Sequence, residues 1–338
     1  MVTVNGANVG LDAGSVVDAS GGSGGGEVFL GGGIQGKDET LTNSTSTVVE
    51  KGAIIRADAL SDGTGGTVVA WADGDTMFAG EASARGVSGG GFVEISGKGS
   101  LEFDGTVDTT AMNGTAGTLL LDPTNFRVTT AASSANNVQN TALQTALASN
   151  NVVLSTQSAG GDAGWISVEA DVNWNSGFSL TLLAEESIYF SRDLKNAGSG
   201  NLNLLAGWDS TNFPFATIGG SGTASSTPFA ALPSGDVNMA TAFANLPAFG
   251  NNNGSIVIGR SQSGASGNGV EIGSRAGATN AIGYGMELAG SNSTTNGYAH
   301  LGLIHTAGGT GPSGSIQVEL GAGGLAVTGG NANGAYAQ

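Results

Sequence analysis

Paired carboxylates are the feature of this 338-residue sequence that comes nearest to a known catalytic chemistry. Three pairs stand close together in the chain: Asp73/Asp75, Asp104/Asp108 and Glu185/Glu186. A glycosidase needs two carboxylates on either side of the bond that it breaks. Side chains of adjacent strand residues point to opposite faces, so Glu185 and Glu186 cannot share a site without a bend. We expect all these carboxylates to be solvated turn residues, and we predict no catalytic residues.

Basic residues bear on a second chemistry, the elimination reaction of a polysaccharide lyase. That reaction needs a cation to neutralise a uronate and a base to take its proton. The ten Lys and Arg residues are spread thinly, and no cluster is visible among the first five: Lys37, Lys51, Arg56, Arg85 and Lys98. The sequence therefore favours a chain without turnover chemistry.

Candidate metal ligands are also sparse. His300 and His305 are five residues apart, which puts them on opposite faces of a regular strand and disfavours a shared metal ion. The turn Asp73-Gly74-Asp75 is rich in oxygen ligands, but no EF-hand loop or Gly-Asp nonapeptide repeat accompanies it. The glycine-rich run 21–26 lacks the Gly-Lys-Ser/Thr of a phosphate loop. We predict no metal site and no cofactor.

The elements that must position these residues are short strands punctuated by glycine. There are 61 Gly in the chain, charged residues make up only 11%, and no collagen period is present. Val68, Val93 and Leu119 each stand at the same point of an apolar run after a small-residue turn, with spacings of 93 − 68 = 25 and 119 − 93 = 26. A second strand signal recurs at 76–80 and 101–103. This period indicates a solenoid, in which parallel strands of successive repeats stack and share one core.

The runs 68–71 and 119–121 are too short for helices, and their apolar character suits strands buried on both faces. We divide the chain into β-helix rungs at 1–121, a loop with a short helix at 122–150, rungs at 151–206, a loop excursion at 207–253 and rungs at 254–338. The excursion is predicted from four prolines among small residues: Pro214, Pro228, Pro233 and Pro247.

The one helix that the sequence predicts lies near residues 137–149. Asn137 is its candidate N-cap. Five residues share one apolar face of this helix: Val138, Ala142, Leu143, Ala146 and Leu147. We expect that face to be buried against the chain's own strands; the alternative is a partner-binding amphipathic helix.

The charge balance, 10 basic against 27 acidic residues, gives a net charge of −17. Nucleic acid and anionic membranes need a basic surface, so we predict no nucleic-acid partner. The chain has no cysteine and no apolar run long enough to span a bilayer. It begins in a strand pattern at residues 2–4 and ends in another at 336–338, so we expect the intact protein to continue in both directions and its open strand edges to associate end to end.

Three consecutive stretches, AWADGDTMFAGEASARG, GGFVEISGKGSLEFDGTVD and GTLLLDPTNF, resemble the filamentous-haemagglutinin-type large exoproteins of two-partner secretion, including their haem-utilisation/adhesion group. The following block, ALQTALASNN onward, is similar to the block that follows in that family. The resemblance is specific over residues 60–205 and looser elsewhere. It implies a right-handed parallel β-helix, which is the all-β fold that we predict, with one short extra helix and a long loop excursion.

The same resemblance implies a structural, adhesive shaft, secreted to the surface of a Gram-negative bacterium, and not an enzyme. Its partners would be an outer-membrane transporter, acting through an N-terminal secretion domain, and a glycan or protein on a host or neighbouring cell. That secretion domain, with its Asn-Pro-Asn signatures, is missing here; only residues 122–125 are faintly similar. The alternatives are a polysaccharide-active β-helix enzyme and a haem- or ligand-capture module.

Overall fold

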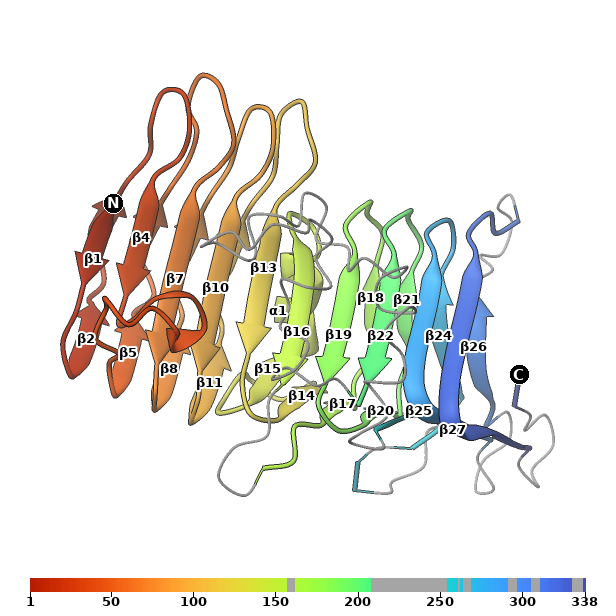
Figure 1. Cartoon of the computed structure of the whole chain (residues 1–338). Coiled ribbons are helices and arrows are strands. Elements are labelled where there is room, and N and C mark those ends of the chain that lie inside the picture. The colour runs from red at the N-terminus through yellow and green to blue at the C-terminus, as the bar shows by residue number, and fades with distance from the viewer. Residues whose placement is uncertain are drawn as a thin grey trace. The chain divides into compact units, whose positions relative to one another are not determined.

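Short parallel strands form most of the computed structural model, which describes residues 1–156, 162–207, 254–260, 262–263, 269–290, 297–304, 311–329 and 337–338. The fold of these residues is all-β and solenoid-like, with long parallel sheets (Figure 1). The chain divides into two units, which are described separately. The described residues of Met1–Thr124 and Ala131–Ser155 belong to the first, and those of Asn125–Thr130, Thr156–Gly220 and Asp236–Gln338 to the second.

Each of the first four repeats contributes one strand to each of three parallel sheets. The first sheet has the order β1 (Val2–Val4), β4 (Glu27–Leu30), β7 (Thr67–Ala72), β10 (Phe92–Gly97), β13 (Thr118–Asp122) and β16 (Asn151–Thr156). The second contains β2 (Asn8–Leu11), β5 (Ser46–Val49), β8 (Asp75–Phe78) and β11 (Ser100–Phe103). The third contains β3 (Val16–Asp18), β6 (Ile54–Arg56), β9 (Glu81–Ser83) and β12 (Thr106–Asp108).

The register of these sheets confirms the predicted repeat. Val93 on β10 pairs with Val68 on one side and with Leu119 on the other, so the two spacings found in the sequence are the lengths of two successive repeats. Phe103 likewise pairs with Phe78, and their rings stack with centroids 6.2 Å apart. Every residue of β7, β10 and β13 is buried, as predicted for strands covered on both faces.

Glycines precede the strands of the first sheet because neighbouring backbones nearly touch there. The amide of Gly66 donates to the carbonyl of Ala57, and in the next repeat the amide of Gly91 donates to the carbonyl of Ala84. A Cβ on Gly91 would overlap the carbonyl oxygen of Gly66 in the preceding repeat. A larger residue would therefore force successive turns apart at this corner.

Residues 31–43, most of the loop between β4 and β5, lie over part of the outer face of the first sheet, and we call them the strap. It contains the one-turn 3₁₀ helix η1 (Ile34–Gly36) and crosses in front of β7 (Figure 1). Its Ile34 and Leu41 pack on Phe29, Val69 and Trp71 of β4 and β7. The strap lengthens this repeat, yet β4 and β7 still pair in register, with Val28 opposite Val68.

The predicted helix is shorter than expected and starts later. Helix α1 runs from Asn140 to Ala146, Gln139 occupies its N-cap position without a side-chain bond, and Asn137–Gln139 form strand β15. The prediction of Asn137 as N-cap was therefore wrong. Asn136 has a left-handed φ of 55°, and its amide donates to the Leu101 carbonyl at 2.7 Å while its side-chain oxygen accepts from the Leu101 amide at 2.9 Å. These bonds to β11 hold the preceding turn and delay the helix.

Four of the five residues on the apolar face of the predicted helix are buried against the chain itself: Val138, Leu143, Ala146 and Leu147. The fifth, Ala142, is partly exposed. Neither helix of the described residues has the length and apolarity needed to cross a bilayer.

Three strand series form the second unit. One contains β14 (Phe126–Thr129), β17 (Ile166–Val168), β20 (Ile188–Phe190), β23 (Ser255–Ile258) and the second half of β25 (Thr279–Ala289). Another contains β18 (Val172–Trp174), β21 (Leu194–Asn196), β24 (Val270–Ser274) and β26 (Ala299–Leu303). The third contains β19 (Leu180–Ala184), β22 (Leu202–Ala206), the first half of β25 and part of β27 (Ile316–Thr328).

Strand β14 lies inside the range 122–150 that was predicted as loop and helix. Phe126 and Val128 are buried and pair in parallel with Ile166 and Val168 of β17. Pro123 and the Ser/Asn-rich run that follows concealed this short strand, because its burial depends on a partner strand far along the chain. The predicted excursion lies, apart from Gly207, outside the described residues.

Candidate ligand-binding groove

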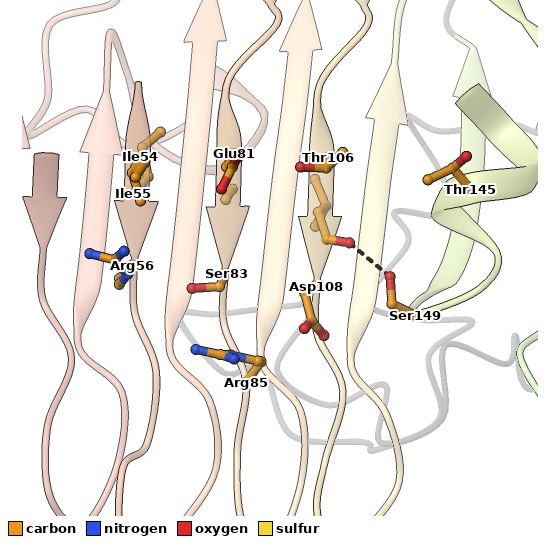
Figure 2. Close-up of a pocket in the computed structure, with 12 residues that line it drawn as sticks. Ile54, Ile55, Arg56, Glu81, Ser83, Arg85, Thr106, Asp108, Thr145 and Ser149 are labelled. Carbon is orange, nitrogen blue, oxygen red and sulfur yellow. Dashed lines mark hydrogen bonds between the residues drawn. The ribbon is translucent and has the colours of Figure 1, made fainter. Parts of the chain in front are cut away.

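A groove of about 340 Å³ lies on the outer face of the third sheet in the first unit (Figure 2). Its floor consists of two rows of side chains that cross β6, β9 and β12 in register. One row contains Ile54, Glu81 and Thr106, and the other contains Arg56, Ser83 and Asp108. Alternate residues of the same strands, such as Ile55 and Val107, point into the core and are buried. The strand periodicity of two therefore presents the polar rows outward.

One wall of the groove is provided by α1 and the residues that follow it, with Thr145 and Ser149 (Figure 2). The Ser149 hydroxyl donates to the carbonyl of Val107 on β12 at 2.9 Å. Asn150, fully buried, donates to the same carbonyl at 2.8 Å and accepts from the Thr109 amide at 2.9 Å. These bonds fix the end of the helical segment to the edge of the sheet.

Arg85 supplies a fixed positive charge at one end of the groove. Its guanidinium contacts the buried carboxylate of Asp58 at 2.6 Å, and its own amide donates to the same carboxylate at 2.8 Å. The hydrogen bond to Asp58 raises the pKa of Arg85, with the charges of Asp58 and Asp108 adding to the effect. Because about half of the Arg85 side chain stays exposed, its remaining N–H groups can donate to a molecule in the groove.

The two acidic side chains of the groove are placed differently. One oxygen of Asp108 accepts from the amide and hydroxyl of Thr110, at 2.9 and 2.7 Å, in a local turn. Glu81 is exposed and belongs to the other row. The groove thus combines two guanidinium groups, two carboxylates and four hydroxyl groups, whereas none of its twelve lining residues is aromatic. Such a surface can exchange hydrogen bonds with a polyhydroxylated ligand but offers no ring for stacking.

Arg56, Arg85 and Asp108 are the residues singled out in the sequence that the fold brings to the groove. Arg56 and Arg85, which stand far apart in the sequence, line the same groove from neighbouring repeats. Asp104, the predicted companion of Asp108, does not line the groove.

Sequence reasoning missed five polar residues of the groove: Glu81, Ser83, Thr106, Thr145 and Ser149. The signal for Glu81 is its pairing with Thr106 one repeat later, at the same period as in the first sheet. Thr145 and Ser149 gave no signal, because their place beside β12 depends on how the helical segment folds back on the sheet.

The remaining acidic candidates serve local contacts. Asp73 accepts from the Asn43 amide group of the strap at 3.2 Å, and Asp75 accepts from the Ser100 hydroxyl of the next repeat at 2.6 Å. Glu185 and Glu186 follow β19 and are partly exposed. Burial raises the pKa of Glu186, and a hydrogen bond with Tyr189 acts in the opposite direction.

His300 lies on β26 with its Nδ1 3.6 Å from one carboxylate oxygen of Glu271, whose other oxygen is 3.3 Å from the ammonium group of Lys195. His305 lies outside the described residues, so the predicted separation of the two histidines is not tested. Among the residues that the structure describes, no three His, Asp or Glu side chains are grouped closely enough to hold a metal ion.

No protein-family model matches the chain, and a comparison with curated proteins finds no match either.

Proposed function

We propose that this chain is a right-handed parallel β-helix and that it serves as a structural, adhesive shaft segment of a secreted bacterial surface protein of the filamentous-haemagglutinin type. The observation that carries the proposal is the in-register parallel pairing of successive repeats, seen for Val68, Val93 and Leu119. Each added repeat extends the backbone ladders and the core without a new fold, which suits an elongated spacer. The stretches that resemble the exoprotein family are the same ones that form these repeats.

The groove is the surface of this shaft that we assign to attachment, with a neutral or mixed-charge glycan as its ligand. Neighbouring strands of a sheet lie about 4.8 Å apart, close to the length of one sugar unit in an extended glycan. The row of Arg56, Ser83 and Asp108 therefore offers a donor, a hydroxyl and an acceptor to consecutive sugars. Arginine and carboxylate side chains both form two hydrogen bonds at once, which suits neighbouring sugar hydroxyls.

A glycan array probed with the purified chain tests this assignment. We expect binding that Arg56→Ala weakens at least tenfold and that Lys98→Ala, an equal loss of charge at an exposed turn residue outside the groove, leaves unchanged. Equal loss in both variants would show only a general charge effect and would contradict the groove assignment. Retention of one tight soluble ligand such as haem, with no glycan binding, would support the capture-module alternative.

An enzyme of the polysaccharide-active class is the second candidate, because the groove contains two carboxylates on adjacent strands. Glu81 pairs with Thr106, and Asp108 stands two residues further along the same strand. Strand positions that are diagonal neighbours lie about 7–8 Å apart, so their carboxyl groups can reach the separation of roughly 6.5–9.5 Å found in inverting glycosidases. The amide of Thr110 donates to one oxygen of Asp108 and holds this carboxylate in a local turn. A carboxylate held in this way suits ligand binding better than catalysis. Release of reducing ends from a glycan panel, abolished by Glu81→Gln and Asp108→Asn, would replace the adhesive proposal by the enzymatic one.

Secretion through an outer-membrane transporter, display on a Gram-negative surface and end-to-end self-association stay predictions.

A further inference from the structure

Two carboxyl groups are buried beneath the strap on the outer face of the first sheet. Glu94 on β10 is fully buried and Asp122 on β13 is 6% exposed. Ser96 pairs with Asp122, so Glu94, two residues earlier on β10, is the diagonal neighbour of Asp122 on the adjacent strand. An apolar side chain would ordinarily occupy such positions, as Val69 does at the position on β7 that pairs with Glu94.

Gln35 of the strap holds both carboxyl groups. Its backbone amide donates to the two oxygens of Glu94 at 3.0 and 3.2 Å, and its side-chain amide donates to Asp122 at 3.4 Å. Its side-chain oxygen accepts from the ammonium group of Lys37 at 3.0 Å. Gln35 takes up a left-handed conformation, φ 53° and ψ 23°, which is unfavourable for a residue with a Cβ. The strap therefore accepts backbone strain in order to bring both amide groups of Gln35 onto the buried pair.

The charged groups that face Glu94 come from the strap and from β13. Lys37 favours its ionised form, whereas Asp122 disfavours it. On β7, the positions that pair with Glu94 and Ser96 carry Val69 and Trp71, which have no titratable group. Burial raises the pKa of Glu94 to about 8, the charge of Asp122 adds to the rise, and the Gln35 amide, Ser96 and Lys37 act in the opposite direction. At neutral pH Glu94 is therefore mostly protonated.

We propose that the strap is a pH-sensitive latch, closed while Glu94 is protonated and opened when its ionisation places a second negative charge, beside Asp122, in a site sealed from water. Opening admits water to both carboxylates and leaves the three-sheet frame intact. It also uncovers the apolar strip Phe29, Val69 and Trp71.

Two features of the closed strap favour opening. Gln35 leaves its strained conformation when the strap lifts. The indole N–H of Trp71 has no hydrogen-bond partner in the described part of the chain while the strap is closed, and it gains water on opening. The contacts that oppose opening include the bond from the Asn43 side-chain amide to the Gly36 carbonyl, at 2.9 Å, and the apolar packing of Ile34 and Leu41.

Hydrogen exchange of the full chain, read by mass spectrometry and corrected for the intrinsic pH dependence of exchange, tests the latch. Amides of residues 31–43 should exchange about tenfold faster at pH 9 than at pH 7, because the ionised fraction of a group with a pKa of about 8 rises about tenfold over that range. Amides of β11 and β12 should show no such transition. Equal exchange of the strap at both pH values would overturn the proposal.

Two substitutions separate the latch from a general alkaline loosening. Glu94→Gln removes the ionisable group and should abolish the transition, whereas Glu102→Gln, a partly exposed residue of β11, should leave it unchanged. A transition that persists unchanged in Glu94→Gln would overturn the latch.

The variant Asp122→Asn provides a second test of the latch if Glu94→Gln does not fold. Removing the charge of Asp122 takes away one cause of the raised Glu94 pKa, so the midpoint of the transition should move to lower pH. The transition should also be smaller, because ionisation of Glu94 then creates a single charge without a neighbour that repels it. A midpoint and a size that both equal those of the wild type would overturn the part of the proposal that gives Asp122 a share in opening the strap.

Discussion

Replacing Glu94 by Gln is expected to remove a pH dependence of stability that the wild-type chain shows between about pH 4.5 and pH 8. The carboxyl group has an ordinary pKa of 4.5 in the unfolded chain and a pKa of about 8 in the folded one, where burial is the main cause of the rise. Between these values the folded chain binds one proton more than the unfolded chain. The contribution to stability is therefore complete below pH 4.5 and is lost as the pH rises through 8.

The magnitude follows from the difference of 8 − 4.5 = 3.5 pKa units. At 1.36 kcal/mol per unit the wild type loses about 5 kcal/mol over the whole range, of which about 3 kcal/mol is lost by pH 7. These are upper limits, because an opening strap lets Glu94 ionise at a smaller cost. Gln keeps an acceptor for the Gln35 amide and offers Asp122 a donor without a charge. The variant should therefore match the wild type near pH 4.5 and exceed it at pH 7.

Thermal unfolding followed by circular dichroism at pH 5, 7 and 8.5 measures the effect. A gain of about 3 kcal/mol corresponds to a rise of the midpoint on the order of 10 °C for a unit of this size. Midpoints of the same transition are compared, since a chain of stacked repeats need not unfold in two states. Parallel pH profiles for wild type and Glu94→Gln, with the Glu102→Gln control also parallel, would refute the reasoning.

Three further outcomes follow from the repeats. Phe103→Ala should destabilise the first unit by about 3–5 kcal/mol through its cavity and the lost stack on Phe78, and a loss below about 1 kcal/mol in urea unfolding would contradict that packing. Gly91→Ala should lower the yield of folded protein, whereas Gly22→Ala, with open space at its Cβ, should not; equal yields would contradict the close turn. Asn150→Ala should cost about 1–3 kcal/mol and speed exchange of the Thr109 amide, and unchanged protection of that amide would contradict the role of Asn150 as its acceptor.

Local features of the sequence determined the strands and their period. Apolar runs such as 68–71 and the glycines before them are readable without a partner, because alternation, length and turn chemistry are properties of neighbouring residues. Where the repeat length is constant, it also fixes which residues of successive strands pair. The alignment of Val68, Val93 and Leu119 therefore follows from the sequence alone and agrees with their pairing. The buried face of α1 followed in the same way from the spacing of its apolar residues.

Tertiary pairing decided the features that depend on the lengths of the intervening loops. Asn136 binds to β11 and so delays the start of α1, and Gln35 reaches Glu94 from a distant part of the sequence. Arg56 and Asp108 meet in one row although they belong to strands two repeats apart. Composition and periodicity do not encode these contacts, because an insertion such as the strap changes the length of a repeat. Only the backbone hydrogen bonds between strands then show which residues lie side by side.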